Sequence, residues 1–402
     1  MGNNLCLASR GYKKLAVDHE YSIFVDVDHP SLFLRVQATA ASWSSSIIPR
    51  TGFLQTPQNS PIAMFNLPTV LLFGLSIFSL ANETAAAGRR TDARRSRQVA
   101  RQADSKNQGA GKAWKQVDRY EGHDFLAGWD FFNKGDPTHG LVNYVDAETA
   151  QEKHLAKVED GQVILAADDT TVLRSGDKRD SVRISTKKTY NGGLFIADIA
   201  AMPVGCGIWP AYWSVGPDWP NGGEIDILEG VHNQDTNQYT LHTAAGCSLN
   251  NAVKTTSRVL GTTCASSGAD NTGCAFRDTD ARSYGHGFNG AGGGVYAHLW
   301  DSAGIKIWHF ARSEIPQDIK DGKPDPSKWP TPAAQFAASS CDVGKYFHDN
   351  SLVFDTTFCG DWAGATYASA GCPGTCAERV ADPKNFQDAK WKINYVAVYQ
   401  LD

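Results

Sequence analysis

The sequence predicts an all-β fold in which two antiparallel sheets form a sandwich. Segments rich in β-branched and aromatic residues follow one another through the second half of the chain, where long helical periodicity is hard to find. Glycine is abundant, at 38 of 402 residues, and clusters of Gly and Asn such as residues 285–294 are typical of turns. This succession of strands and turns indicates a sandwich.

Six strands are expected, over residues 193–199, 238–243, 294–300, 304–310, 351–358 and 391–400. The last shows the alternation most clearly, because its apolar side chains, beginning with Trp391 and Ile393, are interleaved with polar Lys392 and Asn394. Residues 315–332 contain five prolines, which remove backbone donors, so this stretch is expected to be a surface loop. No internal repeat is present, which favours one sandwich domain.

Three acidic residues lie within one short apolar segment, Asn221-Gly-Gly-Glu-Ile-Asp-Ile-Leu-Glu-Gly230. Carboxylates as close as Glu224, Asp226 and Glu229 repel one another, which is costly unless the charges have a use. Glycoside hydrolysis requires two carboxyl groups, one to attack the anomeric carbon or activate water and one to protonate the leaving oxygen. This segment contains both.

The spacing of the three acids predicts a β-bulge. Strand side chains alternate between faces, so Glu224 and Asp226 share one face while Glu229 would lie on the other. One extra residue between Asp226 and Glu229 restores Glu229 to the acidic face, and bulges are common beside active sites. On a concave sheet the carboxyl groups of Glu224 and Glu229 would then approach to about 5 to 5.5 Å, the separation found in retaining enzymes.

A calcium loop and a solvated acidic strand are the alternatives for this segment. Apolar Ile225, Ile227 and Leu228 argue against simple solvation, and the spacing of an EF-hand loop is absent. We therefore expect a carboxylate active site with no metal and no cofactor.

The segment Gly-Glu-Ile-Asp-Ile-Leu-Glu resembles the signature of glycoside hydrolase family 16 in its bulged, laminarinase-like form. Further segments resemble fungal endo-1,3(4)-β-glucanases of this family, in the expected order: 129–132, 136–146, 207–213, 288–297 and 359–363. The resemblance covers about residues 118–402. It implies a β-jelly-roll sandwich of the concanavalin A type, with two curved antiparallel sheets and a concave substrate cleft.

The resemblance also implies a role for each acid. Glu224 would be the nucleophile, Glu229 the general acid/base, and Asp226 the helper that orients the nucleophile and tunes both proton affinities. The physics fits these roles, because like charges at close range push two titrations apart and leave one group ionised while its partner stays protonated. The acids should titrate as a coupled set.

Six further residues are candidates for substrate binding: Trp209, Trp213, Trp219, His242, Asn143 and Trp362. The first three precede Glu224 closely, and sugar rings stack their C–H faces on aromatic rings. Their alternative is the sandwich core, and the resemblance favours the cleft. By the same resemblance the other three line or support the cleft, although a lone His in a strand is more often a structural group.

The net charge of the chain restricts the class of binding partner. The net charge of −5 offers no overall basic surface for nucleic acid, and a neutral polysaccharide needs none. Sulfated galactans would favour Arg and Lys in the cleft, and the candidate residues include neither. A neutral β-glucan is therefore the expected partner of a protein that we expect to be a monomer.

Cysteine usage indicates an oxidising compartment. Eight of the nine cysteines fall in the expected domain, between Cys206 and Cys376, and Cys6 lies far from them. An even set of this kind indicates disulfides in a secreted protein, with 105 pairings that the sequence leaves open. The spacing Cys372-Pro-Gly-Thr-Cys376 is a poor match to zinc sites.

The N-terminal part differs in character. Residues 1–63 are expected to be an unstructured extension upstream of a true start of translation at Met64. The apolar run 68–81 is short for a membrane span of about 20 residues, so residues 64–87 are interpreted as a signal peptide. Residues 88–115 would be a disordered Arg-rich pro-segment, and residues 116–402 the family 16 catalytic domain.

A type II membrane anchor, with residues 1–60 in the cytosol, is the alternative to secretion. Six arginines follow the apolar run, between Arg89 and Arg101, and positive residues tend to stay on the cytosolic side. This charge distribution favours secretion to the medium or the cell wall, without stable membrane insertion.

Three functions are considered. The first is a secreted retaining endo-β-glucanase, which cuts internal β-1,3 bonds, and β-1,4 bonds adjacent to them, in laminarin and lichenan by double displacement. The others are a wall-remodelling glucan transglycosylase and a non-catalytic β-glucan-binding protein. The first leads, because a binder needs no pair such as Glu224 and Glu229, and the transglycosylases of the family resemble a shorter, unbulged motif.

Overall fold

The structure, a computed structural model, describes residues 12–16, 21–26, 35–38, 113–267 and 270–402. The chain divides into two compact units, Met1–Asn82 and Glu83–Asp402. The expected signal peptide at 64–87 and most of the expected pro-segment lie outside the described residues. None of the helices in the described part has the length and apolar character that crossing a bilayer requires.

The N-terminal unit contains a three-stranded antiparallel sheet. Its strands are β1 (Tyr12–Ala16), β2 (Tyr21–Asp26) and β3 (Arg35–Ala38), in that order. These three segments fall within residues 1–63, for which the sequence predicts an unstructured extension, and that domain assignment stays a prediction. Tyr, Ile, Val and Phe favour strands, but segments of four to six residues are too short for their alternation to be distinctive.

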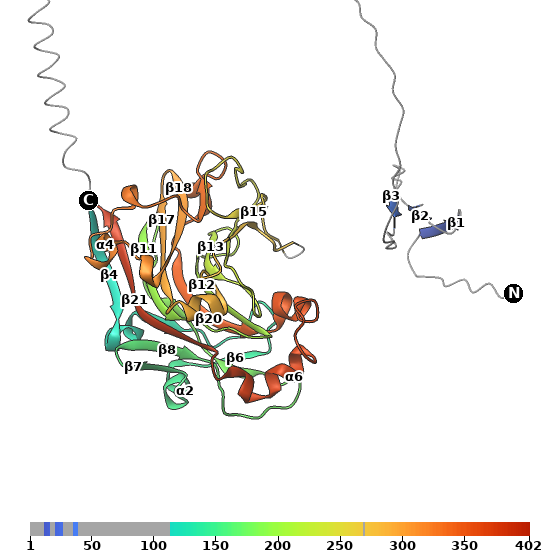
Figure 1. The fold of residues 1–402 in the computed structure, drawn as a ribbon, viewed down its shortest axis with the longest axis horizontal. Helices are drawn as coiled ribbons and strands as arrows, with labels where there is room; N and C mark the ends of the chain where they lie inside the picture. Colours follow the sequence, from blue (N-terminus) through green and yellow to red (C-terminus); the bar gives the residue numbers. More distant parts are fainter. Residues whose placement is uncertain (1–11, 17–20, 27–34, 39–112, 268–269) are drawn as a thin grey trace, which may run out of the picture. The chain divides into compact units, whose positions relative to one another are not determined.

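The second unit is a sandwich of two large antiparallel sheets, which confirms the predicted fold class (Figure 1). Sheet I has eight strands in the order β15 (Arg258–Gly261), β16 (Cys274–Arg277), β14 (Gln238–His242), β13 (Glu224–Glu229), β12 (Ile208–Val215), β20 (Ser351–Phe358), β10 (Arg183–Thr186) and β5 (Trp129–Phe131). Strands far apart in sequence are neighbours here, so this sheet needs the whole domain.

Sheet II also has eight strands. Seven follow the order β19 (Ala334–Ala337), β18 (Gly304–Ala311), β17 (Gly294–Asp301), β11 (Gly193–Ala201), β21 (Lys390–Leu401), β8 (Gln162–Ala166) and β7 (Ala156–Glu159), and β4 (Trp114–Glu121) pairs with β21. Because β4 begins at Trp114, the domain starts two residues before the expected boundary at 116. All six strands expected from the sequence are present, within one or two residues of their predicted ends.

Short elements connect the strands. The parallel pair β6 (Val142–Tyr144) and β9 (Arg179–Ser181) forms a separate two-stranded sheet beside β20. The α-helices are α2 (Ala147–Glu152), α3 (Gly285–Gly290), α4 (Gln317–Lys320), α5 (Val343–Tyr346) and α6 (Cys376–Ala381), and Gly360–Gly364 forms one π-helical turn, η5. Short 3-10 turns are η1 (Gly122–Asp124), η2 (Leu126–Gly128), η3 (Arg312–Glu314), η4 (Pro326–Lys328) and η6 (Pro383–Phe386). Figure 1 shows α2, α4 and α6 at the periphery of the strands.

The main core lies between the sheets, and strand alternation determines which residues enter it. In β11, Phe195 enters this core, whereas its neighbours Leu194 and Ile196 belong to a second apolar cluster on the other face of sheet II. Trp329 and Ile319 complete that second cluster. They come from residues 315–332, so the expected surface loop in fact covers sheet II.

One expected turn contains a helix. Residues 285–294 were predicted as turns from their glycines, and the first six of them form α3. The buried ring of Phe288 anchors this helical turn to the main core, and such an anchor outweighs the low helix propensity of glycine.

The eight domain cysteines form four disulfides, which confirms the prediction of an oxidised domain. The pairs are Cys206–Cys372, Cys247–Cys341, Cys264–Cys274 and Cys359–Cys376. Cys206–Cys372 attaches the segment that follows β20 to the rest of the sandwich, and Cys359–Cys376 closes a loop within that segment. Cross-links of this kind stabilise a fold chiefly by restricting the unfolded chain.

Candidate active site

Strand β13 carries the three acids and the predicted bulge. Asp226 pairs with Trp213 on β12 and with Thr240 on β14, and the register shifts on both sides before Glu229. Ile227 and Leu228 are consecutive residues that are both fully buried in the core. A regular strand cannot turn two successive side chains to one face, so this bulge returns Glu229 to the face of Glu224 and Asp226.

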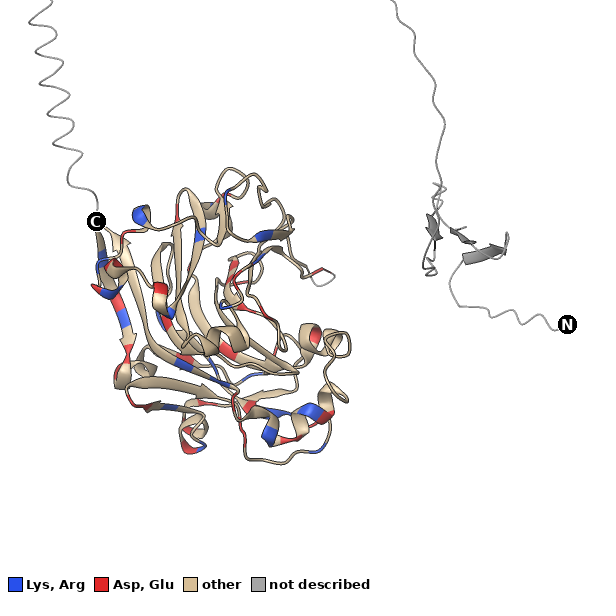
Figure 2. Ribbon diagram, in the orientation of Figure 1, with Lys and Arg blue, Asp and Glu red and all other residues tan. Residues whose placement is uncertain are grey.

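The neighbouring strands turn alternate residues to the same face of sheet I. Trp209, Ala211, Trp213 and Val215 of β12 line a cleft of about 670 Å³, whereas Tyr212 between them lies in the core. Strand β14 repeats the pattern with Gln238, Thr240 and His242 in the cleft, and β20 does so with Asp355 and Thr357. In Figure 2 the acidic segments of β13 lie among strands that are otherwise mostly uncharged.

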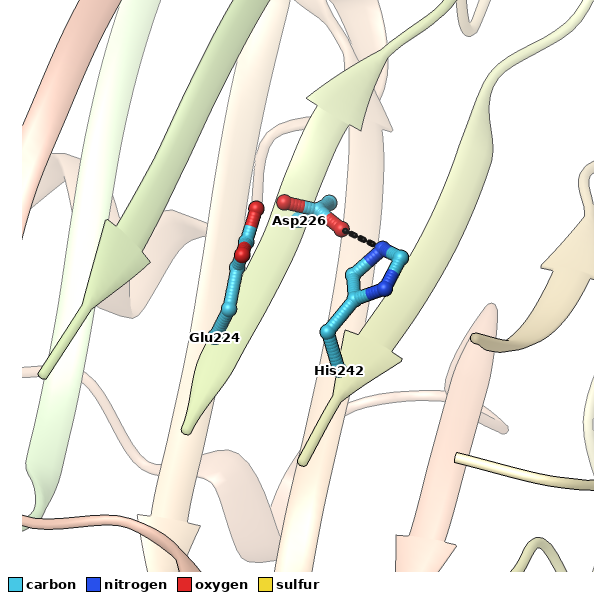
Figure 3. A group of neighbouring side chains, drawn as sticks. All are labelled: Glu224, Asp226 and His242. Carbon is cyan, nitrogen blue, oxygen red and sulfur yellow. Dashed lines mark ion pairs between the residues drawn. The ribbon is translucent and has the colours of Figure 1, made fainter. Parts of the chain in front are cut away.

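Glu224, Asp226 and His242 form one group on the floor of this cleft (Figure 3). Nε2 of His242 lies 3.3 Å from Oδ2 of Asp226, and Nδ1 of the same ring is 2.8 Å from the hydroxyl oxygen of Ser266. Oxygen and nitrogen atoms of the three side chains lie within 4.8 Å of one another, close enough to hold a cation. Both nitrogens of the imidazole already face a partner, and the expectation of no metal stays a prediction.

Two indole N–H groups donate hydrogen bonds to Glu224 and Glu229, the first and last of the three acids. Nε1 of Trp209 donates a hydrogen bond of 2.8 Å to Oε1 of Glu229, and Nε1 of Trp219 donates to Oε2 of Glu224. The ring of Trp362 packs edge-on against Trp209, with 5.6 Å between centroids. The aromatic side chains therefore hold the two glutamates in position and also line the cleft.

The environment raises the pKa of two of the three acids. Burial, then the charges of Asp226 and Glu224, raises the pKa of Glu229 well above its usual range, against the opposing effects of Trp209 and His242. Burial and the neighbouring Glu224 likewise raise the pKa of Asp226. Glu229 is thereby suited to keep a proton at neutral pH, as a general acid must.

Five of the six candidate binding residues line the cleft: Trp209, Trp213, Trp219, His242 and Trp362. Asn143 is not among the lining residues, and its contact with substrate stays a prediction. Its flanking residues Val142 and Tyr144 are buried, so alternation turns Asn143 outward, where its Nδ2 donates to Oδ1 of Asp180 at 2.6 Å.

Charged residues that the sequence analysis missed also line the cleft. Arg183 lies there, although its guanidinium is engaged by Asp355 at 3.8 Å and by the rings of Phe132 and Trp213. Burial, partly offset by Arg183, raises the pKa of Asp355 to about 7. In the sequence, Asp355 could have been identified as a candidate cleft residue, because it is an acidic residue at the centre of the otherwise uncharged strand Ser351–Phe358.

The sequence profile of the XgeA-like catalytic domain of glycoside hydrolase family 16 matches residues 129–399. A probable glycosidase of Schizosaccharomyces pombe, C21B10.07, is 45% identical over 72% of this chain and 70% of its own length. An endo-1,3(4)-β-glucanase of Arthroderma benhamiae is 44% identical over 70% of this chain and 64% of its own length. The chain spans 47% of a third relative, a probable endo-1,3(4)-β-glucanase of Aspergillus clavatus.

Solved structures agree. Laminarinase 16A of Phanerochaete chrysosporium, with β-glucans in donor and acceptor sites, is 42% identical and covers 72% of this chain and all of its own, with a TM-score of 0.70. An elongating family 16 β-1,3-glucosyltransferase is 43% identical over the same shares, with a TM-score of 0.69. On the strength of the bulged acidic strand, the sandwich and these matches, the chain belongs to glycoside hydrolase family 16.

Proposed function

We propose that this protein is an endo-β-glucanase that hydrolyses internal β-1,3 bonds, and β-1,4 bonds adjacent to them, with retention of configuration. The observation that carries the proposal is the bulge, because it brings Glu224 and Glu229 to one face of the cleft with unequal surroundings. The named glucanases among the relatives support a β-glucan as the substrate.

In the first step the carboxylate of Glu224 attacks the anomeric carbon while the carboxyl group of Glu229 gives its proton to the leaving oxygen. The glycosidic bond breaks as the bond to Glu224 forms, and the released sugar leaves with the proton. The hydrogen bond from Trp219 holds Glu224 during the attack. Asp226, held beside Glu224, orients that carboxylate.

In the second step water replaces the released sugar. Glu229, now ionised, takes a proton from the water, and the oxygen attacks the anomeric carbon as its bond to Glu224 breaks. Both substitutions invert the carbon, so the product retains the β configuration. The aromatic walls at Trp209, Trp213 and Trp362 stack on sugar rings and hold the chain across the acids.

The test is release of reducing sugar from laminarin, lichenan and agarose by the purified protein, with Glu224→Gln alongside. We expect release from laminarin and lichenan that disappears in the variant. In Glu224→Ala, added azide should restore turnover and give a glycosyl azide of inverted configuration. Undiminished turnover by Glu224→Gln would contradict the assignment, and a folded wild-type protein that binds glucan without cleaving it would favour the binding alternative.

Transglycosylation is a second candidate, since the β-1,3-glucosyltransferase is as similar to this chain as laminarinase 16A is. In that reaction a sugar hydroxyl, rather than water, receives the glycosyl group from Glu224. Incubation with laminariheptaose distinguishes the two outcomes. Products that are all shorter than the substrate indicate hydrolysis, whereas products longer than the substrate, formed together with the shorter fragment that leaves first, indicate transfer.

Secretion is also part of the proposal. Four disulfides support an oxidising compartment, and the apolar run 68–81 that we interpret as a signal peptide lies outside the described residues. N-terminal sequencing of the protein from culture medium should find a mature start between residues 82 and 113. Recovery of the intact chain from membranes would favour the anchored alternative.

A further inference from the structure

At the bulge, some backbone groups of β13 have no hydrogen-bond partner on the neighbouring strands. Ile227 has no partner residue on either β12 or β14. Its carbonyl oxygen accepts a hydrogen bond of 2.8 Å from Nδ2 of Asn237, and the backbone N–H of Glu229 donates one of 2.8 Å to Oδ1 of the same side chain. One amide group thus spans the irregular part of the strand.

The position of Asn237 is itself fixed. The residue is fully buried, its backbone N–H donates to the hydroxyl of Ser283 at 3.0 Å, and its carbonyl accepts from the backbone N–H of Asp278 at 2.9 Å. Because one of its side-chain contacts is a carbonyl and the other is an N–H, only one orientation of the amide satisfies both. Asn237 is absent from the residues that line the cleft.

We propose that Asn237 is a positioning residue for Glu229, because it holds the bulge that turns this acid into the cleft. The inference rests on the proposed function, in which Glu229 protonates the leaving oxygen. Asparagine is suited to this place, since its one planar amide supplies both a donor and an acceptor and replaces the bonds of the missing ladder.

A misplaced general acid affects substrates unequally. A sugar leaving group needs the proton of Glu229, whereas a dinitrophenolate group leaves readily without one. General acid catalysis contributes about 10²- to 10⁴-fold, and a displacement of 1 Å can cost about 10²-fold. Loss of the Asn237 amide should therefore slow cleavage between sugars and spare cleavage of an activated aryl glycoside.

The experiment measures kcat/KM of Asn237→Ala on laminarin and on dinitrophenyl β-laminaribioside. We expect a loss of about 10²-fold on laminarin and a loss within about threefold on the aryl glycoside, where the attack by Glu224 limits the rate. Near-UV circular dichroism confirms that each variant is folded. An equal loss on both substrates, or no loss on laminarin, overturns the inference.

Asn289→Ala is the matched control. The side chain of Asn289 also bridges a backbone N–H and a carbonyl, both of Met202 and both at 2.9 Å, but far along the chain from the bulge and outside the cleft lining. A purely structural role of a bridging amide predicts the same behaviour from the two variants. We expect Asn289→Ala to change the two kcat/KM values by the same factor.

Asn237→Asp tests the donor separately. When protonated, the new carboxyl group can donate to Ile227 and accept from Glu229 as the amide does; when ionised, it loses the donor and repels the carbonyl. The variant should thus approach the wild-type rate on laminarin at acid pH and lose activity as pH rises, with a smaller change on the aryl glycoside. A constant ratio between the two substrates at all pH values overturns the inference.

A crystal structure of Asn237→Ala decides the matter independently of activity. We expect β13 to take a regular register, or the side chain of Glu229 to leave the cleft. An unchanged bulge with Glu229 in place overturns the inference, whatever the activity of the protein. A wild-type protein that cleaves no β-glucan overturns the proposed function, and the crystal structure still tests the role of Asn237.

Discussion

The outer faces of the two sheets carry similar tryptophans and serve different ends. On sheet II, Nε1 of Trp308 donates to the carbonyl of Pro330 at 2.8 Å, and in the segment 315–332 that covers this sheet Nε1 of Trp329 donates to Asp318 at 2.9 Å. Both N–H groups therefore bind the covering segment. On sheet I, the indoles of Trp209 and Trp219 donate to Glu229 and Glu224. Tryptophan thus completes a second apolar core on one face and positions the acids of the active site on the other.

The difference follows from what covers each face. Residues 315–332 lie over sheet II and bury its apolar side chains, which completes a second apolar cluster. No comparable segment covers the acidic face among the described residues, where Trp219 keeps 40% of its surface exposed. A face left open keeps polar groups near water and a site for a substrate, whereas a covered face contributes stability. Each prediction below tests one side of this comparison.

The largest effect is expected on the open face. Glu229→Gln should lower kcat on laminarin by about 10³-fold, because general acid catalysis is lost. The folded protein should be at least as stable as the wild type, since an amide replaces a carboxyl group whose ionisation burial disfavours. Exposed Glu314, which pairs with Arg282, provides the control; a comparable loss of kcat in Glu314→Gln would contradict this account.

A tryptophan pair tests both faces with one substitution type. Trp329→Ala should lower the free energy of unfolding by about 3–5 kcal/mol, because it empties a buried site, and should leave kcat/KM of the folded protein unchanged. Trp219→Ala should lower stability by less than about 1 kcal/mol, since the ring is exposed, yet reduce kcat/KM about tenfold. Urea unfolding and laminarin kinetics measure both. If Trp219→Ala proves the more destabilising, the comparison fails.

Two buried carboxyl groups should respond to pH in opposite directions. Burial raises the pKa of Asp355 to about 7, so between pH 4 and pH 7 the folded state keeps a proton that the unfolded state has released, and stability falls as pH rises. Burial also acts on Asp168, but hydrogen bonds from Thr170 and Thr171 outweigh it and lower its pKa to about 2. Its contribution is complete above pH 4 and is lost as pH falls towards 2.

Asp355→Asn should therefore gain stability relative to the wild type as pH rises from 5 to 8. Asp168→Asn, outside the cleft, should cost about 1–3 kcal/mol at pH 7 because its hydrogen bonds weaken, and the cost should shrink near pH 2. Urea unfolding of each variant over this range measures both trends. Parallel pH dependence in the two variants would show that cleft and non-cleft carboxyls do not differ as proposed.

The smallest effect concerns one hydrogen bond. Trp209→Phe keeps an aromatic ring against Trp362 and removes the donor to Glu229, a bond that lowers the pKa of that acid. The pKa of Glu229 should rise, and the alkaline limb of the pH profile of kcat/KM should move up by about half a unit. Trp362→Phe keeps the bond and should leave the limb in place. A shift to lower pH in Trp209→Phe would reverse the assigned role of the indole.

Strand alternation explains how much of this was accessible from the sequence. The strands, the sandwich and the bulge follow from periods that a single sequence displays, since Ile227 and Leu228 break the period of two between acids. The same rule turns Asn143 outward once Val142 and Tyr144 are known to be buried. Only the resemblance places Asn143 in the cleft, and this placement stays a prediction.

What escaped the sequence depends on contacts between distant segments. In the sequence Asn237 has the character of a loop residue, and only the structure shows that its amide binds the bulge. The five prolines of residues 315–332 predict a surface loop, although Trp329 in this segment is buried against sheet II. The disulfide pairs join residues up to 166 positions apart. No local pattern encodes such partners, so they require the folded chain.

The central claim is that Glu224 and Glu229 act together in a double displacement, and the configuration of the first product tests it most directly. Proton NMR during hydrolysis of laminarin by the purified protein resolves the α and β anomers of the new reducing ends. The account predicts that the β anomer appears first and that the α anomer grows later by mutarotation. Initial release of the α anomer would contradict it, because a single displacement by water would then replace attack by Glu224.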